Sequence, residues 1–299
     1  MTHSGFVAIV GRPNVGKSTL VNALVGTKVA ITSKRPQTTR NTIRGVLTRR
    51  NEAGEPDSQL VLVDTPGLHK PKTALGERLN SLVYGTLAES DVNVFLLDAL
   101  QPVGPGDRRI AERLKEAGSP VVVVVNKIDI APKSVVAERL LEASEWDFDA
   151  YVPASALEGA ALEPIVEELV ARLPEGPLYF PTDAISDQPE QQLIGEIVRE
   201  KFLDRLRDEL PHSLTVIVRD MEQRDSGTLY VDAVAVVERS SQKGIIIGKG
   251  GEMLRTAGSE ARAELETIFG TKVFLDLRVR VEKDWQQQPE LLDRLGFPG

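Results

Sequence analysis

Two patterns of hydrophobic and polar residues divide the chain. Up to residue 173, short runs of consecutive apolar residues alternate with longer stretches in which apolar residues recur every three or four positions. The first pattern is typical of strands buried on both faces of a sheet, and the second of amphipathic helices. The predicted strands are 6–10, 60–63, 94–97, 121–125 and 151–153, and the predicted helices are 17–24, 76–89, 106–117, 135–141 and 163–173. This order predicts an α/β doubly wound domain with a parallel sheet, which binds ligands at the carboxyl ends of its strands.

The pattern changes after Pro174. Residues 174–189 contain four prolines and fit neither periodicity, which predicts a linker. Beyond it the sequence predicts an α+β domain with the order α-β-β-α-α-β. Its expected elements are a helix at 191–209, strands at 213–219 and 229–238 joined by a turn at 224–227, an apolar run at 245–247, a glycine cluster, helical residues to 268 and a strand at 272–281. We therefore expect domains at 1–173 and 190–299, the second ending in a tail from residue 285.

A glycine-rich loop follows the first predicted strand and precedes the first predicted helix. Residues 11–18 read GRPNVGKS and match the phosphate-loop pattern G-x-x-x-x-G-K-[ST]. Glycines let backbone N–H groups converge on phosphate oxygens, and the helix N-terminus adds the positive end of its dipole. The lysine of this pattern reaches the β- and γ-phosphates, and the serine binds Mg²⁺. The residues expected to hold the phosphates are Gly11, Arg12, Pro13, Asn14, Val15, Gly16, Lys17, Ser18 and Thr19.

Two further segments have the composition of nucleotide switches. Asp64-Thr65-Pro66-Gly67 follows the second predicted strand, where a carboxylate can hold Mg²⁺ and a glycine amide can sense the γ-phosphate. Residues 34–44, KRPQTTRNTIR, are polar and can lend a threonine hydroxyl to Mg²⁺ when the γ-phosphate is present. We choose Thr39 for this role, and Thr38 remains the alternative. The expected magnesium ligands are therefore Ser18, Thr39 and Asp64.

The selection of guanine is predicted by residues after the last two strands of the first domain. Asn126-Lys127-Ile128-Asp129 ends the fourth predicted strand. A buried Asp129 carboxylate can accept hydrogen bonds from the N1–H and amino group of guanine, and adenine would leave it unpaired. Asn126 and Lys127 would support the loop and the base, and Ser155-Ala156 would offer a backbone N–H to the guanine O6.

Composition narrows the functional classes. The chain has no cysteine, which excludes disulfides, thiolate metal sites and cysteine nucleophiles. Its formal charge of −8 argues against broad, nonspecific binding of polyanions, although a local basic site remains compatible with it. Apolar runs such as 121–125 are only strand-length, so we expect no signal peptide and no transmembrane segment. We expect a cytoplasmic monomer, with any membrane contact at the periphery.

The motifs of the first domain resemble those of the translation-factor-related P-loop GTPases. The GRPNVGKS loop, the segment Gln37-Thr38-Thr39-Arg40 and Asp64-Thr65-Pro66-Gly67-Leu68 are similar to the Era branch of that class. The resemblance covers nearly the whole chain. It implies a GTPase that uses Mg²⁺, binds the 3′ end of small-subunit (16S) ribosomal RNA and assists maturation of the small (30S) subunit. It also implies an association with the inner face of the cell membrane.

The second domain resembles a type II KH domain. Residues 244–251, GIIIGKGG, look like its G-x-x-G loop, in which small residues let a nucleic-acid backbone approach closely. The expected RNA-binding residues are Ile247, Gly248, Lys249, Gly250 and Gly251. An adjacent apolar groove would receive about four splayed bases, with Ile246 and Ile247 as its floor. We expect Trp285 and Phe297 of the tail to pack against the domain rather than stack on bases.

Leu68 predicts slow hydrolysis. It occupies the place where Ras-like proteins carry a glutamine that orients the attacking water, and a leucine cannot do this. The resemblance implies other elements, including a K⁺ ion held partly by Asn14. We therefore expect intrinsic turnover on the order of 10⁻⁴ to 10⁻² s⁻¹, as for unassisted GTPases.

Two alternatives to a GTPase that controls RNA engagement remain open. In one, the chain is an RNA-binding assembly factor that uses GTP mainly as a structural ligand, which Leu68 leaves room for. In the other, it is a GTP-gated membrane or protein switch whose second domain does not bind RNA.

Overall fold

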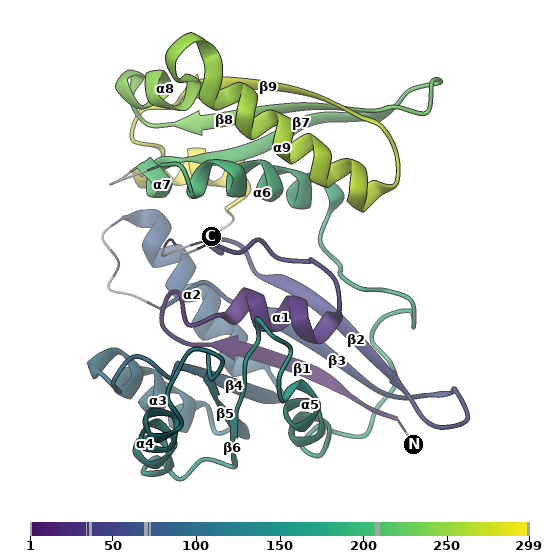
Figure 1. Ribbon diagram of the computed structural model, residues 1–299, viewed down its shortest axis with the longest axis vertical. Coiled ribbons are helices and arrows are strands. Elements are labelled where there is room, and N and C mark those ends of the chain that lie inside the picture. Colours follow the sequence, from purple (N-terminus) through teal and green to yellow (C-terminus); the bar gives the residue numbers. More distant parts are fainter. Residues whose placement is uncertain are drawn as a thin grey trace. The chain divides into compact units, whose positions relative to one another are not determined.

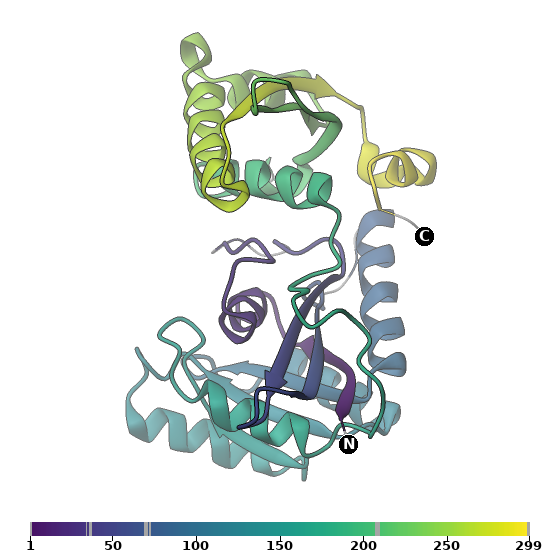
Figure 2. The ribbon, with the colours of Figure 1, turned by 90° about the vertical axis from the view of Figure 1, so that its right-hand side faces the viewer.

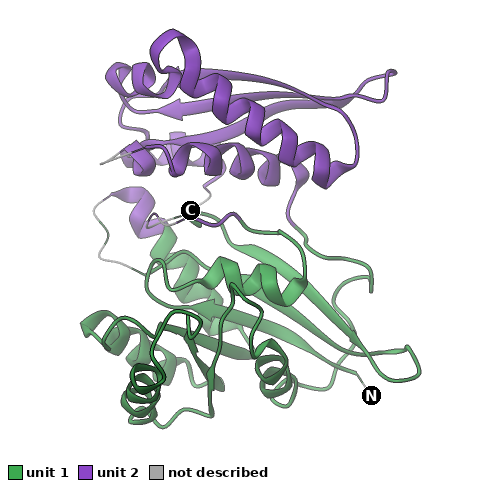
Figure 3. Cartoon of the chain, in the orientation of Figure 1, with its two compact units in different colours: residues 1–30, 36–71, 79–187 green, residues 31–35, 72–78, 188–299 purple. Residues whose placement is uncertain are grey.

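The computed structural model describes residues 2–33, 35, 38–68, 71, 73–206 and 210–297. Two compact units are present (Figure 3): unit 1 comprises residues 1–30, 36–71 and 79–187, and unit 2 comprises residues 31–35, 72–78 and 188–299. Gln37 of the predicted switch segment, Glu209 at the predicted end of a helix and Gly299 at the end of the tail lie outside the described residues. No helix among the described residues is long and apolar enough to cross a bilayer.

Unit 1 is built on a six-stranded sheet with the order β2-β3-β1-β4-β5-β6 (Figure 1). The strands are β1 (His3–Val10), β2 (Ile43–Arg50), β3 (Pro56–Asp64), β4 (Val92–Asp98), β5 (Val121–Asn126) and β6 (Ala150–Pro153). All neighbouring strands are parallel except β2 and β3, which are antiparallel. The apolar pattern does not predict β2, because this strand lies at the edge of the sheet and its second half is polar.

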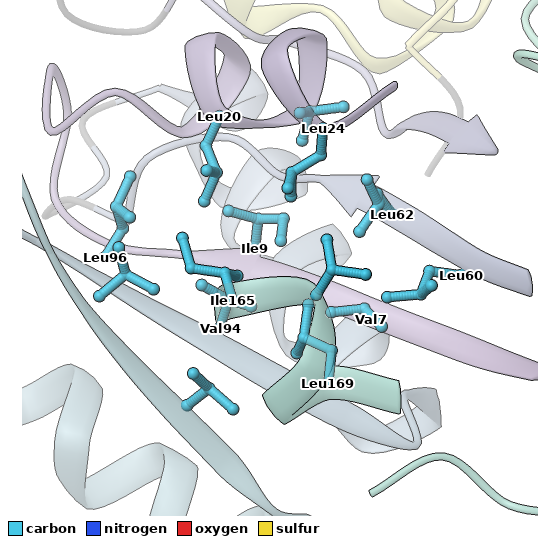
Figure 4. Packing of buried hydrophobic residues seen from close by; sticks show 14 of the residues in the cluster. Val7, Ile9, Leu20, Leu24, Leu60, Leu62, Val94, Leu96, Ile165 and Leu169 are labelled. Carbon is cyan, nitrogen blue, oxygen red and sulfur yellow. The ribbon is translucent and has the colours of Figure 1, made fainter. Parts of the chain in front are cut away.

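Helices cover both faces of this sheet, which confirms the predicted doubly wound class. Helices α1 (Lys17–Val25) and α5 (Leu162–Val170) lie on one face, where Leu20 and Ile165 pack near Ile9 (Figure 4). Helices α2 (Ala74–Glu89), α3 (Pro105–Ala117) and α4 (Lys133–Ser144) lie on the other face, where Ile110 and Val123 are buried in one cluster. Because both faces are covered, ligand chemistry is left to the loops at the strand ends.

Unit 2 has the predicted order α-β-β-α-α-β. Its sheet has the order β7 (Thr215–Gln223), β8 (Leu229–Val237) and β9 (Val273–Val281), with β7 antiparallel and β9 parallel to β8. Helices α6 (Glu190–Leu203), α8 (Ser240–Ile247) and α9 (Glu252–Phe269) pack on one face of the sheet around a single apolar core (Figure 2). The shorter elements are α7 (Leu210–Ser213), the 3₁₀ turns η1 (Lys249–Gly251) and η2 (Trp285–Gln287), and α10 (Pro289–Arg294).

The predicted linker belongs largely to unit 1. Residues 174–187 cluster with that unit, and the Gln59 side chain accepts hydrogen bonds from the N–H groups of Tyr179 and Phe180 at 2.8 and 2.9 Å. The domain limits taken from the sequence stay a prediction.

The tail packs within unit 2, as expected. Trp285 is fully buried, stacks on Phe297 with ring centroids 5.7 Å apart, and donates its indole N–H to the Ser213 carbonyl at 3.0 Å. Both rings are buried against each other and are not available to bases.

Candidate functional site

The phosphate loop connects β1 to α1 in a conformation that needs glycine. Gly16 has φ 103°, and a Cβ there would lie 2.3 Å from Nδ2 of Asn126. Asn14 also adopts the left-handed region, with φ 64°. The Lys17 ammonium donates to the carbonyls of Gly11 and Arg12 at 3.3 and 3.2 Å. The predicted loop is thus a tight turn closed by its own lysine.

Burial perturbs this lysine. Lys17 is 7% exposed, and its removal from water lowers its pKa from 10.5 to about 8, against the opposing attraction of Asp64. A lysine in this state gains from a nearby anion, because a phosphate group would restore the charged form.

Three oxygen-bearing side chains converge beside Lys17. Ser18 Oγ lies 2.6 Å from Asp64 Oδ2 and 3.0 Å from Thr39 Oγ1, and Thr39 Oγ1 lies 3.1 Å from the same carboxylate oxygen. Asp64 is fully buried, which raises its pKa, while the hydrogen bonds from Ser18 and Thr39 oppose that rise. Its other oxygen, Oδ1, is buried with no hydrogen-bond partner of normal geometry among the described residues.

This cluster fits a hard cation. Hydroxyl and carboxylate oxygens are the ligands that Mg²⁺ prefers, and the buried Oδ1 is an acceptor without a donor. In the described part of the chain, no group of three or more His, Cys, Asp or Glu side chains could hold a metal. A cation here would therefore rely on hydroxyls, phosphate and water in addition to Asp64.

One amide connects the phosphate loop to the loops after β5 and β6. The Asn126 side chain, 3% exposed, donates to the Val15 carbonyl at 2.8 Å and accepts from the Ala156 N–H at 2.9 Å. The next residue, Lys127, donates its ammonium to the Asn14 carbonyl at 2.8 Å. The predicted phosphate and guanine motifs therefore form one connected structure.

The predicted base-recognition residues are neighbours. Ser155 Oγ donates to Asp129 Oδ1 at 2.6 Å and accepts from the Glu158 N–H at 3.1 Å. Asp129 itself is exposed, which corrects the buried position expected from the sequence. The reason is that it lies in the loop three residues beyond the end of β5, where the apolar layers no longer cover the chain.

The predicted switch segment Asp64-Thr65-Pro66-Gly67 lies against β1 and the phosphate loop. Thr65 donates its hydroxyl to the Ile9 carbonyl at 2.8 Å, and a Cβ on Gly67 would lie 3.0 Å from Pro13. Leu68 packs against the apolar cluster under α2 and α3. Its side chain is therefore part of the core and offers no group to a water.

Sequence reasoning missed two acidic residues that bind the basic side chains of the nucleotide loops. Asp98, at the end of β4, accepts from the Lys127 ammonium at 2.6 Å, and Asp107 of α3 forms an ion pair with Arg12 at 2.9 Å. The Arg12 side chain is thus directed to α3. No motif contains either aspartate: Asp98 is the last residue of a strand that carries no motif and Asp107 lies in the helix that follows, so their roles depend on tertiary contacts.

The glycine loop of unit 2 lies between α8 and α9. Gly248, Gly250 and Gly251 have φ values of 75°, 60° and 78°. A Cβ on Gly250 or Gly251 would meet nothing within 4 Å, whereas one on Gly248 would lie 2.8 Å from Met253. Lys249 is exposed at the tip. The loop therefore presents bare backbone and one cation to its surroundings.

A groove of about 320 Å³ lies beside this loop, between α9 and β9. Its lining combines apolar side chains, two arginines and small residues: Gly251, Leu254, Arg255, Gly258, Ser259, Arg262, Leu275 and Leu277. Ile246 does not form its floor as predicted, because this side chain is fully buried in the core of unit 2. Ile247 is half-buried and is not part of the lining either. Sequence patterns do not indicate a groove between α9 and β9, because these two elements come together only in the fold.

Comparison with known proteins identifies two domain families in the chain. Residues 6–127 match the family model described as 50S ribosome-binding GTPase, and residues 209–286 match the KH domain model. GTPase Era of Mycolicibacterium paratuberculosis is 52% identical over 300 residues, covering 98% of each chain. GTPase Era of Mycobacterium tuberculosis is 50% identical over 302 residues, covering 99% of each.

Solved structures of Era have the same fold. Aquifex aeolicus Era, in a tyrosine-to-alanine variant bound to GDP and AlF₄⁻, matches with a TM-score of 0.94 and 40% identity over the whole of both chains. Era in complex with MgGDPNP and nucleotides 1506–1542 of 16S ribosomal RNA matches equally well.

The fold and the two sites define a P-loop GTPase unit followed by a KH unit. The chain belongs to the GTPase Era family. The predicted fold class and family resemblance are therefore confirmed.

The position of Asn126 generates a stability prediction. Replacing Asn126 by alanine leaves the Val15 carbonyl and the Ala156 N–H buried without their partner, and should lower the free energy of unfolding by about 2–4 kcal/mol. Denaturant unfolding followed by circular dichroism measures this. Asn93→Ala is the matched control, because Asn93 is equally buried but its amide has no hydrogen-bond partner among the described residues. Equal losses in the two variants would contradict the bridging role.

Proposed function

We propose that this chain binds GTP with Mg²⁺, hydrolyses it slowly, and uses its KH unit to bind the 3′ region of 16S ribosomal RNA during assembly of the small (30S) ribosomal subunit. The observation that carries the proposal is the convergence of Ser18, Thr39 and Asp64 within 3.1 Å, next to a phosphate-loop lysine. Support also comes from the relatives, whose solved structures include MgGDPNP and 16S ribosomal RNA nucleotides.

The roles of the nucleotide-binding residues follow from their positions. Backbone N–H groups of residues 11–19, except Pro13, which has none, and the Lys17 ammonium would bind the phosphates. Ser18, Thr39 and Asp64 would hold Mg²⁺, which neutralises charge between the β- and γ-phosphates. Thr39 is favoured over Thr38, because the Thr39 hydroxyl already lies beside Ser18. Asp129 would accept from guanine, with Asn126, Lys127, Ser155 and Ala156 shaping the loops around the base.

Slow hydrolysis follows from the apolar surroundings of Leu68. Its side chain is committed to the core under α2 and α3, so the chain must orient water by another group. A K⁺ ion beside Asn14 is the cofactor that the family resemblance implies. The role of Thr38, Thr65, Pro66 and Gly67 would be to report the presence of the γ-phosphate.

RNA binding follows from the glycine loop and the groove. Ile247, Gly248, Lys249, Gly250 and Gly251 would let the RNA backbone approach, and the groove between α9 and β9 would receive splayed bases. Arg255 and Arg262 in its wall supply positive charge, and Leu254, Leu275 and Leu277 supply apolar surface. We propose that the protein acts in the cytoplasm as a monomer, with peripheral membrane contact as a secondary association.

The experiment that tests the nucleotide assignment is a competition. Purified protein with Mg²⁺ should bind a fluorescent GDP analogue that GTP displaces and that a hundredfold excess of ATP does not. Single-turnover phosphate release with and without the target RNA then separates a GTPase from an assembly factor that holds GTP as a structural ligand. Crosslinking to ribosomal RNA in cells separates both from a membrane or protein switch. Equal displacement by ATP would remove the basis of the proposal.

A pH dependence follows from the lowered pKa of Lys17. The nucleotide-free chain loses the Lys17 proton near pH 8, and phosphate binding needs the charged form, so the affinity for GDP should fall about tenfold between pH 7 and pH 9. Calorimetry at pH 8.5 in two buffers of different ionisation enthalpy should show proton uptake when GDP binds.

The stability of the fold responds to pH in the opposite sense. The unfolded chain holds the Lys17 proton up to pH 10.5, so the Lys17 contribution to stability rises between pH 8 and 10.5. A pH-independent affinity would contradict the role of Lys17.

The RNA site is tested by a charge reversal on the exposed loop. Replacing Lys249 and Gly250 by aspartates places two carboxylates where the RNA backbone would approach, and should weaken binding of a single-stranded 16S 3′-end RNA at least a hundredfold. Affinity for GDP should stay unchanged. Glu290→Lys is a control for charge elsewhere in unit 2. RNA affinity that survives the double aspartate change would move the site away from this loop.

A further inference from the structure

Asp98 contacts Lys127 of the predicted guanine motif but belongs to no nucleotide-binding motif itself. It is the last residue of β4 and pairs in register with Asn126, the last residue of β5. The residue is 8% exposed. Its Oδ1 accepts from the Leu100 N–H at 3.0 Å, which fixes the carboxylate in the turn after the strand. Its Oδ2 is therefore held in one position at the edge of the site.

That second oxygen binds the lysine of the guanine motif. The Lys127 ammonium donates to Asp98 Oδ2 at 2.6 Å and to the Asn14 carbonyl at 2.8 Å. Two acceptors thus fix the direction of the Lys127 side chain before a nucleotide binds. Less rotamer freedom then has to be lost when the nucleotide binds. The bond to Asp98 is charge-assisted, the stronger class of hydrogen bond.

The carbonyl that Lys127 binds belongs to an unusual residue. Asn14 has φ 64°, a conformation that costs a non-glycine residue energy, and Lys127 itself has φ 71°. Two left-handed residues from different loops are therefore joined by one hydrogen bond. Such a conformation persists only when its surroundings hold it. The Lys127 ammonium provides that support for the phosphate loop, and Asp98 orients the ammonium.

We propose that Asp98 is a positioning residue for nucleotide binding: through Lys127 it holds the Asn14 turn of the phosphate loop in the shape that retains the nucleotide. The carboxylate contacts neither phosphate nor base. Its effect is expected on the residence time of the nucleotide more than on hydrolysis, since Ser18, Thr39 and Asp64 do not touch it. This inference rests on the proposed function of unit 1 as a nucleotide-binding unit.

The test is the dissociation rate of a fluorescent GDP analogue from the full-length protein with Mg²⁺, chased with excess GDP. Asp98→Ala should release the analogue roughly tenfold or more faster, the size expected for loss of a charge-assisted hydrogen bond. Asp98→Asn, which keeps one acceptor oxygen, should fall between wild type and Asp98→Ala.

A double-mutant cycle separates this role from a general loss of structure. If Asp98 acts through Lys127, Asp98→Ala added to Lys127→Met should accelerate release less than twofold. Asp91→Ala is the matched control: Asp91 precedes β4 at the opposite end and accepts from the Phe6 N–H at 2.7 Å, far from the phosphate loop. This variant should lower stability and leave the dissociation rate within twofold of wild type.

Three results would overturn the inference. These are release from Asp98→Ala within twofold of wild type, effects of the two changes that multiply in the cycle, and release from Asp91→Ala as fast as from Asp98→Ala. Wild-type protein that binds no guanine nucleotide would instead contradict the proposed function itself, so the two failures are distinguishable.

Discussion

The nucleotide site of this protein depends on one buried side-chain amide. Asn126 lies at the end of β5 and joins Val15 of the phosphate loop to Ala156 after β6. Gly16 is a glycine partly for this reason, since any side chain there would meet the Asn126 amide. Parallel strands bring loop ends to one edge of a sheet, but they do not fix the loops relative to each other. Here a single residue with one donor and one acceptor does so, and the predicted phosphate and guanine motifs become one site.

Two ion pairs that involve no motif aspartate support the nucleotide loops. Arg12 and Lys127 both extend from the nucleotide loops to buried or nearly buried aspartates, Asp107 and Asp98. Lys17 and Asp64 are buried in the cluster that would bind phosphate and Mg²⁺. The cations of the unit therefore fall into two groups with different tasks. In the proposed function Lys17 would bind the phosphates, whereas Arg12 and Lys127 form ion pairs with aspartates of the protein.

Much of the fold could be predicted from the sequence because its signals are local. Buried strands of unit 1 are apolar throughout, and the stretches between them have the periodicity of amphipathic helices. These two signals are enough to predict the fold class of the unit and where its strands end. The edge strand β2 was missed because half of it is polar. In the candidate site, residues with a fixed spacing, such as Lys17 and Asp129, could be proposed from the sequence. Asp98, Asp107 and the groove between α9 and β9 could not, because their neighbours are distant in sequence. Ile246 was expected at the floor of the groove and is buried in the core of unit 2, because an apolar run does not indicate which side of a helix meets the core.

The division of the chain into units has a consequence for its modularity. Unit 2 includes residues 31–35 and 72–78, which come from the middle of the first half of the sequence. Ile31 is among the buried residues of the unit 2 core, and Arg78 binds Asp293 at 2.7 Å and the Pro289 carbonyl at 3.3 Å. A C-terminal fragment cut at the proline-rich segment would lack these parts, and an N-terminal fragment would expose them. A fragment that begins after that segment would therefore lack Ile31 from its buried core and Arg78 as the partner of Asp293.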